Sequence, residues 1–169
     1  MPAIRLSKTV LLASIALFAT LVAFGNVTDY RTNFAFVEHV LRMDTVFPDT
    51  SIGWRAIHSP ALHHAAYVLI ITVEAATAVL CWIGAAAMWR ARYAPAAAFN
   101  QSKKWGIVGL TLGFVLWQVG FMSIGGEWFG MWMSQTWNGI ESAFRFFITI
   151  GVVLVFVAMD DRDGPATHP

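Results

Sequence analysis

The sequence has little charge and a single cysteine, and both shortages exclude whole classes of protein. Asp, Glu, Lys and Arg make up 12% of its 169 residues, and the formal net charge is +1. Proteins that bind nucleic acid gather Lys and Arg on one face to neutralise phosphates, so this small, scattered charge excludes that class. Cys81 alone offers neither an intramolecular disulfide nor a cysteine-based zinc site. The sequence also lacks P-loop, G-x-G-x-x-G and Ser-His-Asp patterns.

Apolar residues are abundant instead, at 57% of the chain with a mean hydropathy of +0.60, which is outside the range of soluble domains. A helix needs about 20 mostly apolar residues to cross roughly 30 Å of hydrocarbon. Four segments meet or nearly meet this requirement: 9–27, 62–89, 105–124 and 140–159. Lipid gives backbone groups no hydrogen-bond partners, and the alternating pattern of a barrel strand is absent. The sequence therefore predicts an all-α polytopic membrane protein, a four-transmembrane-helix bundle that forms a single domain over residues 1–169.

The basic residues predict how these spans are oriented. Seven of the eleven Lys and Arg residues fall on one side of the membrane: Arg5, Lys8, Arg90, Arg92, Lys103, Lys104 and Arg162. The positive-inside rule makes that side cytoplasmic, so both termini of a bacterial inner-membrane protein would lie in the cytoplasm. The first segment also has the basic start and apolar middle of a secretory signal, although its apolar run exceeds the roughly 7–15 residues of a signal core.

The two connections on the opposite side are longer than turns. Residues 28–48 carry apolar side chains at helical spacing with charges on other faces, which predicts a short amphipathic helix at the membrane surface, ended by Pro48. In the second connection, Trp128, Trp132 and Trp137 suit an interfacial aromatic belt. These rings could instead, with Glu127 and Met131, line a pocket for an apolar ligand that enters from the bilayer.

Ionisable residues inside the second and fourth segments lie on polar stripes. His63, Tyr67 and Glu74 share one face of the second helix, and Glu74 is roughly 15 Å below the outer boundary at 1.5 Å per residue. Glu141 and Arg145 share one face of the fourth helix. A lone charge inside the bilayer costs between about 2.5 and more than 10 kcal/mol. We therefore expect Arg145 to meet Glu141, Glu74 or both on the inner side of the bundle.

The third segment carries glycines along one face. They stand at offsets of three, four and seven residues: Gly106, Gly109, Gly113 and Gly120. Small residues at such spacing form a groove that lets a neighbouring helix backbone approach closely, which is a common way for membrane helices to pack. This face is therefore predicted to contact another helix of the bundle or another subunit.

Three blocks resemble a known family: "NVTDYRTNFAFVEHVLRMDTVFPD", "WRAIHSPALHHAAYVLIITVEAATAVLCWIGA" and "GGEWFGMWMSQTWNGIESAFRFF". They are similar to the bacterial family of predicted small integral membrane proteins called domain of unknown function 2165, and the resemblance covers nearly the whole chain. It implies a four-span inner-membrane protein without an assigned reaction. No catalytic residue is carried over from it.

These observations favour a non-catalytic accessory or scaffolding subunit that packs against a larger inner-membrane complex, or against itself, within the lipid bilayer. No catalytic residue, metal or cofactor is assigned. One alternative is a small-molecule module whose polar stripes bind a quinone, a lipid or a proton. A second alternative is an outer-face metal site made by His39, His58 and His63 with Glu38, although the sequence has no H-x-x-x-H or H-E-x-x-H spacing.

Overall fold

The computed structural model describes residues 2–163, and these form helices joined by short connections, with no strand in that range. In chain order, the elements are α1 (Pro2–Thr28), α2 (Tyr30–Arg42), η1 (Gly53–Arg55), α3 (Pro60–Ala91), α4 (Ala96–Ser102), α5 (Lys104–Val115), η2 (Leu116–Trp128), η3 (Met131–Met133) and α6 (Ile140–Ala158). The predicted all-α class is confirmed.

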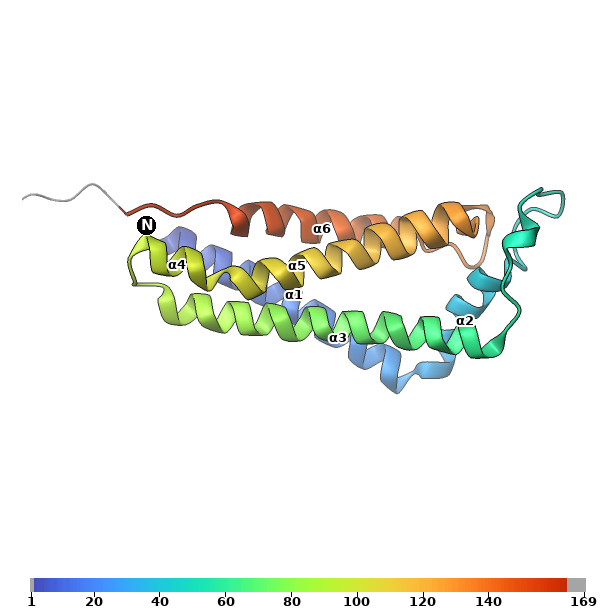
Figure 1. Cartoon of the computed structure of the whole chain (residues 1–169), viewed down its shortest axis with the longest axis horizontal. Coiled ribbons are helices and arrows are strands. Elements are labelled where there is room, and N and C mark those ends of the chain that lie inside the picture. Colours follow the sequence, from blue (N-terminus) through green and yellow to red (C-terminus); the bar gives the residue numbers. More distant parts are fainter. Residues whose placement is uncertain (1, 164–169) are drawn as a thin grey trace, which may run out of the picture.

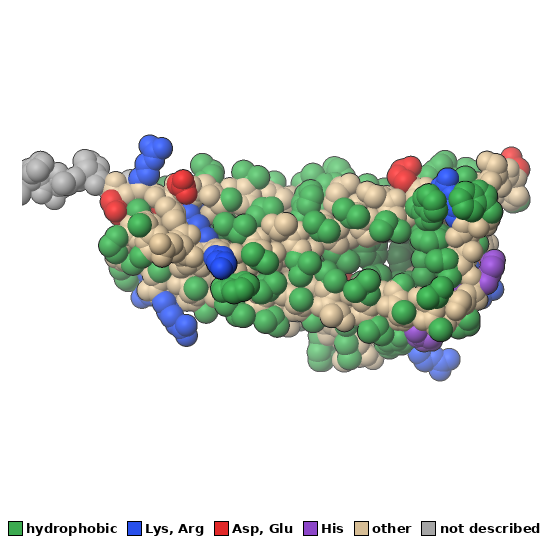
Figure 2. Space-filling view, in the orientation of Figure 1, with side chains coloured by type: hydrophobic (Ala, Val, Ile, Leu, Met, Phe, Trp, Pro, Cys, Tyr) green, Lys and Arg blue, Asp and Glu red, His purple; other side chains and the backbone are tan. Residues whose placement is uncertain are grey.

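Four helical stretches are long and apolar enough to cross a membrane: Ala3–Thr28, Pro60–Ala91, Ala96–Trp128 and Ile140–Ala158. They lie side by side along the long axis of the molecule (Figure 1). We call one end of this bundle the cap end, where α2, η1 and η3 lie, and the other the basic end, where α1 begins and α4 lies. Figure 2 shows hydrophobic side chains over the middle of one face and charged side chains mostly toward both ends, as a bilayer-spanning bundle requires.

The first three spans are longer than predicted. The predictions counted only the continuous apolar residues, whereas the helices also include more polar turns at their ends. The helix containing predicted span 62–89 begins at Pro60, where a missing backbone N–H is tolerated, and continues to Ala91. Predicted span 105–124 begins nine residues earlier, through α4, and continues to Trp128. The fourth span, Ile140–Ala158, agrees with its prediction to within one residue.

The predicted amphipathic helix is α2, which lies across the cap end (Figure 1). Val37 on its apolar face is buried, whereas Glu38 and Arg42 on the other side form an i,i+4 ion pair at 3.3 Å. The helix ends at Met43, whose left-handed backbone (φ 53°) lets its N–H bond to the Val40 carbonyl. The helix is therefore present as predicted, but it ends at Arg42, before Pro48, because the left-handed turn at Met43 stops it first.

Glycines bring α5 and α3 into close contact in the half of the bundle near the basic end. A Cβ added at Gly84 would overlap the backbone of Gly106, and one added at Gly109 would lie 2.8 Å from the Cys81 Sγ. A Cβ at Gly113 would lie 3.0 Å from Thr77. Gly109 and Gly113 thus face α3, whereas Gly106 lies beside the backbone of Gly84 and its own added Cβ would meet Leu12 of α1. Gly120 faces neither helix: the only atom near its added Cβ belongs to Leu116 on its own helix.

Beyond Gly113 the third span changes its winding. Residues from Leu116 to Trp128 continue as the π-helix η2, and the Phe129 N–H bonds to the carbonyl of Ile124, five residues earlier, at 3.0 Å. π-Helical turns are rare and occur often at functional sites. In this chain the π-helix begins just after Gly113, which is the last glycine of the third span in contact with α3.

Candidate functional site

The polar residues predicted on the second span are buried along one side of α3, which we call the α3 stripe. His63, Tyr67 and Glu74 are 1%, 2% and 3% exposed. Asn26 of α1 connects two of them, because its side-chain amide donates to Glu74 Oε2 at 2.8 Å while its backbone carbonyl accepts from the Tyr67 hydroxyl at 3.0 Å. His63 Nε2 is 2.8 Å from the carbonyl oxygen of Ile57. The stripe therefore joins α1 and α3 through hydrogen bonds inside the bundle.

Two oxygens of the α3 stripe have no hydrogen-bond partner among the described residues. They are Glu74 Oε1 and Thr77 Oγ1, both buried. Both residues line an internal cavity of about 10 Å³, which also touches Gly113 and Trp117. A cavity of this size is close to the least that holds one water molecule. The stripe is thus a small polar site enclosed by apolar side chains.

The prediction that Arg145 meets Glu74 or Glu141 is wrong. Arg145 is exposed, forms no ion pair within residues 2–163, and donates only to the hydroxyl of Ser142 at 3.3 Å. Glu141 is exposed and has no ion-pair partner in the same range. Glu74 takes its hydrogen bond from the neutral Asn26 instead.

The reason lies in the two faces of α6. Its apolar face packs into the core: Ala143, Ile150, Val153 and Val157 are buried. The opposite face, which we call the α6 stripe, points out of the bundle: Glu141, Arg145, Ile148, Val152 and Val155. Turning the charges inward would break the close packing of the four buried side chains, and packing between helices, rather than removal of apolar area from water, favours one rotation of a helix in lipid. The charges consequently face whatever surrounds this chain.

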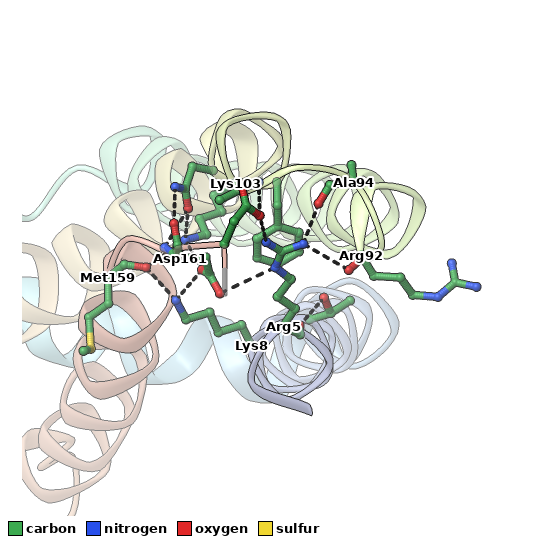
Figure 3. Close-up of polar contacts among 12 residues, drawn as sticks. Arg5, Lys8, Arg92, Ala94, Lys103, Met159 and Asp161 are labelled. Atoms are coloured by element: carbon green, nitrogen blue, oxygen red, sulfur yellow. Dashed lines mark hydrogen bonds and ion pairs between the residues drawn. The ribbon is translucent and has the colours of Figure 1, made fainter. Parts of the chain in front are cut away.

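A cluster of ionic residues at the basic end was not predicted from the sequence. We call it the basic-end cluster: Arg5, Lys8, Asn100, Lys103, Asp161 and Asp163. Figure 3 labels Arg5, Lys8, Lys103 and Asp161 among them. Asp161 Oδ2 accepts from Lys8 Nζ at 2.7 Å and from Lys103 Nζ at 2.6 Å, and both lysine side chains are at least 97% buried. Lys8 and Lys103 also donate to the carbonyl of Met159. The cluster therefore ties α1 and the third span to the chain that leaves α6.

Arg5 extends this cluster toward α4. Its guanidinium donates to the carbonyl of Ala94 at 2.6 Å and lies 3.5 Å from Asp163, which itself accepts from the backbone N–H of Ala96. Burial alone would raise the pKa of Asp161, but the hydrogen bonds and charges of Lys103 and Lys8 outweigh it and hold that pKa below its ordinary value. The carboxylate is therefore charged at neutral pH.

A pocket with an almost wholly apolar lining lies at the cap end, between α3 and η2 and below α2. Its volume is about 360 Å³, within the range of small-molecule sites. The lining is almost wholly hydrophobic and comes from several elements, including Val37, Val40, Ala66, Ile70, Val119 and Phe121. Figure 2 shows the molecule hollowed between these elements. The pocket opens at the side of the bundle, at the depth of the spanning helices.

The three tryptophans of the cap end do not line this pocket. Trp128 and Trp132 are 48% and 47% exposed, and Trp137 stacks on the ring of His39 at 4.6 Å between centroids. Trp128 carries the guanidinium of Arg55 over its ring at 4.5 Å. The pocket wall on this side consists of Phe129 and Met131 instead. Of the residues suggested from the sequence to line such a pocket, only Met131 lines this one.

The histidines suggested for a metal site lie in separate contacts. His39 bonds to Asp44 at 2.9 Å, whereas His63 bonds to the backbone of Ile57. Within residues 2–163, no group of three or more His, Cys, Asp or Glu side chains is arranged to hold a metal ion. The suggested outer-face histidines are therefore not brought together, because His39 on α2 and His63 on α3 face different neighbours.

Four spanning helices with an apolar middle define a polytopic integral membrane protein. The model of the family described as predicted small integral membrane protein, domain of unknown function 2165, matches residues 4–160, and the chain belongs to this family. The resemblance inferred from the three sequence blocks is confirmed. No curated protein and no solved structure matches the chain in these comparisons.

Proposed function

We propose that the protein is a non-catalytic accessory or scaffolding subunit, which packs inside the membrane against another membrane protein or against itself. The observation that carries this proposal is the outward direction of Glu141 and Arg145. Arg145 is the sixth residue of α6, about 8 Å below the start of the helix at 1.5 Å per residue. A charge at membrane depth is costly and normally faces protein or water.

The surface beside Arg145 also suits a protein partner. A groove of about 530 Å³ runs between α1 and α6, and its lining includes Ser14, Arg145 and Thr149. Small residues and hydroxyl groups such as those of Ser14 and Thr149 are typical of membrane-helix interfaces, where close packing and interhelical hydrogen bonds provide the attraction. A partner that covers this surface would give Arg145 and Glu141 the polar contacts that acyl chains do not offer.

Extraction in a mild detergent, followed by mass determination of the intact assembly, tests this proposal. We expect a mass above that of one chain, and we expect Arg145→Met to lower the assembled fraction several-fold because the partner loses its polar contact. Arg31→Met is the matched control, since Arg31 is exposed at the start of α2 and outside the spans. Recovery as a solitary monomer that Arg145→Met leaves unchanged would refute the proposal.

We also propose that this membrane is a bacterial inner membrane with both termini on the cytoplasmic side. The support is the distribution of Lys and Arg, because the side with Arg5, Lys8 and Lys103 holds seven of the eleven. A reporter active only in the cytoplasm, fused after Pro169, should be active. Activity only when the reporter is fused in the connection after α2 would reverse the orientation.

The apolar pocket favours a second candidate function, binding of one acyl chain of a bilayer lipid. The pocket opens sideways at the depth of the spans and is lined almost wholly by hydrophobic groups, so a hydrocarbon tail matches it and a polar solute does not. Its open side would admit such a tail directly from the bilayer.

A phospholipid with a photoactivatable acyl chain tests this second function. Ala66 lines the pocket and Ala65 does not, so Ala66→Phe fills the space while Ala65→Phe places the same ring outside it. We expect Ala66→Phe to reduce labelling of pocket residues several-fold and Ala65→Phe to leave it unchanged. Equal labelling of the two variants would show that the lipid does not enter the pocket.

A further inference from the structure

The α6 stripe has the spacing of a helix-pairing surface. Its members follow one another at intervals of four and three residues: Glu141, Arg145, Ile148, Val152 and Val155. This alternation is the repeat by which two helices pack in a left-handed coiled coil. All five residues are exposed, Val152 and Val155 at 65% and 66%, so the other described elements leave the stripe uncovered.

We propose that the α6 stripe binds a second copy of this chain, with the two α6 helices parallel and with Arg145 of each copy paired to Glu141 of the other. This rests on the proposed function and names its partner. Two copies inserted in the same direction are related by an axis along the membrane normal, so their α6 helices run parallel. In such a symmetric interface, a contact from Arg145 to Glu141 occurs twice.

The depth of the two side chains fits this pairing. The two residues are offset by four positions, about 6 Å along the helix. Side chains on a helix tilt toward its N-terminus, and the Arg145 guanidinium already donates to Ser142, one residue after Glu141. The guanidinium of one copy therefore lies at the depth of the Glu141 carboxylate in the other copy.

Charge complementarity favours a second copy over the other possible occupants. A lipid phosphate would neutralise Arg145 but would repel Glu141, which lies on the same stripe. An uncharged helix would leave both charges without partners. A second copy supplies both signs at once, and the apolar residues Ile148, Val152 and Val155 then pack along the rest of the contact, while the polar layer fixes its register.

Disulfide trapping in native membranes tests the contact directly. Ile148→Cys places a thiol at the centre of the stripe, where facing Cα atoms of two paired helices come within disulfide range. Val68→Cys is the control, because Val68 is also exposed and both residues stand eight positions after the first residue of their helices, α3 and α6. The native Cys81 is fully buried and does not compete. We expect a disulfide-linked dimer from Ile148→Cys and none from Val68→Cys.

Charge reversal then tests the pairing within the same Ile148→Cys background. Glu141→Arg alone and Arg145→Glu alone each create repulsion, and we expect each to lower the linked fraction about tenfold. The double reversal restores complementary charges and should recover most of the linked dimer. Coexpressed with a distinguishable Ile148→Cys chain that keeps Glu141 and Arg145, it should not link to that chain, because like charges would then face each other. Immunoblots measure how much of each variant accumulates in the membrane.

Two results would show that the partner is not a second copy of this chain. These are the absence of a linked dimer from normally accumulating Ile148→Cys, and a linked dimer that both single reversals leave unchanged. If the same protein is still recovered in an Arg145-dependent complex with a different chain, the accessory function stands and only the partner is wrong. If it is recovered as a monomer that Arg145→Met leaves unchanged, both proposals fail.

Discussion

Replacing Asp161 by Asn removes the one carboxylate that holds two buried lysines. The side chain of Asp161 is 7% exposed, and Lys8 and Lys103 approach it at 2.7 and 2.6 Å. Breaking a buried ion pair by removal of one partner costs about 3–5 kcal/mol, because the remaining charge stays buried without compensation. Both lysines keep a second acceptor, the carbonyl of Met159, so the lower limit of this range applies.

A loss of about 3 kcal/mol corresponds to a fall in Tm of roughly 6–12 °C for a chain of this length. Thermal unfolding in a mild detergent, followed by circular dichroism, measures it. Asp160→Asn is the matched control, because Asp160 is the exposed neighbour and has no ion pair within the described range. A Tm for Asp161→Asn within about 2 °C of wild type, or an equal fall for Asp160→Asn, would refute the reasoning.

Three further predictions concern stability. Gly109→Ala should destabilise by about 1–3 kcal/mol because its methyl group would press on α3, whereas Gly25→Ala, with nothing within 4 Å, should be neutral or stabilising in the same melting assay. The pKa of the Asp161 carboxylate is lowered in the folded state, so its contribution to the free energy of unfolding is complete above about pH 4 and is lost as the pH falls through the folded-state pKa. Acidification should therefore lower the Tm of wild type more than that of Asp161→Asn. Asn26→Leu should lower the free energy of unfolding by about 1–3 kcal/mol, because Glu74 loses its hydrogen-bond donor. The double variant Asn26→Leu/Glu74→Leu should recover part of that loss in the same melting assay.

The number of spans and the inner position of the α3 stripe could be predicted because each depends on one helix alone. A spanning helix needs only length and apolar composition, and the spacing of His63, Tyr67 and Glu74 places them on one face whatever the helix packs against. A lone carboxylate at mid-membrane must then turn toward protein. The burial of Glu74 follows from those two facts, although the identity of its partner, Asn26, does not.

The direction of α6 and the basic-end cluster could not be predicted, because both depend on how separate helices pack. The rule that a buried charge needs a partner leaves open whether that partner comes from the same chain, and residues 2–163 supply no ion-pair partner for Arg145. Asp161 lies just past the end of the fourth span and resembles an ordinary polar tail residue. Its partners Lys8 and Lys103 are 153 and 58 positions away, and only the packed bundle shows that they converge.

The two halves of the bundle differ in how closely their helices approach one another. At the basic end, Gly84 and Gly106 let the backbones of α3 and α5 come into contact. The basic-end cluster joins the first turns of α1 and the third span to Asp161, just after α6, in the same region. Past Gly113 larger side chains keep α3 and the third span apart, η2 widens, and the apolar pocket opens between them. Arg145 lies in this second half as well. The close helix contacts and the buried ion pairs at the basic end stabilise the bundle there. The cap half can therefore expose Glu141, Arg145 and an open pocket to its surroundings while the bundle stays folded.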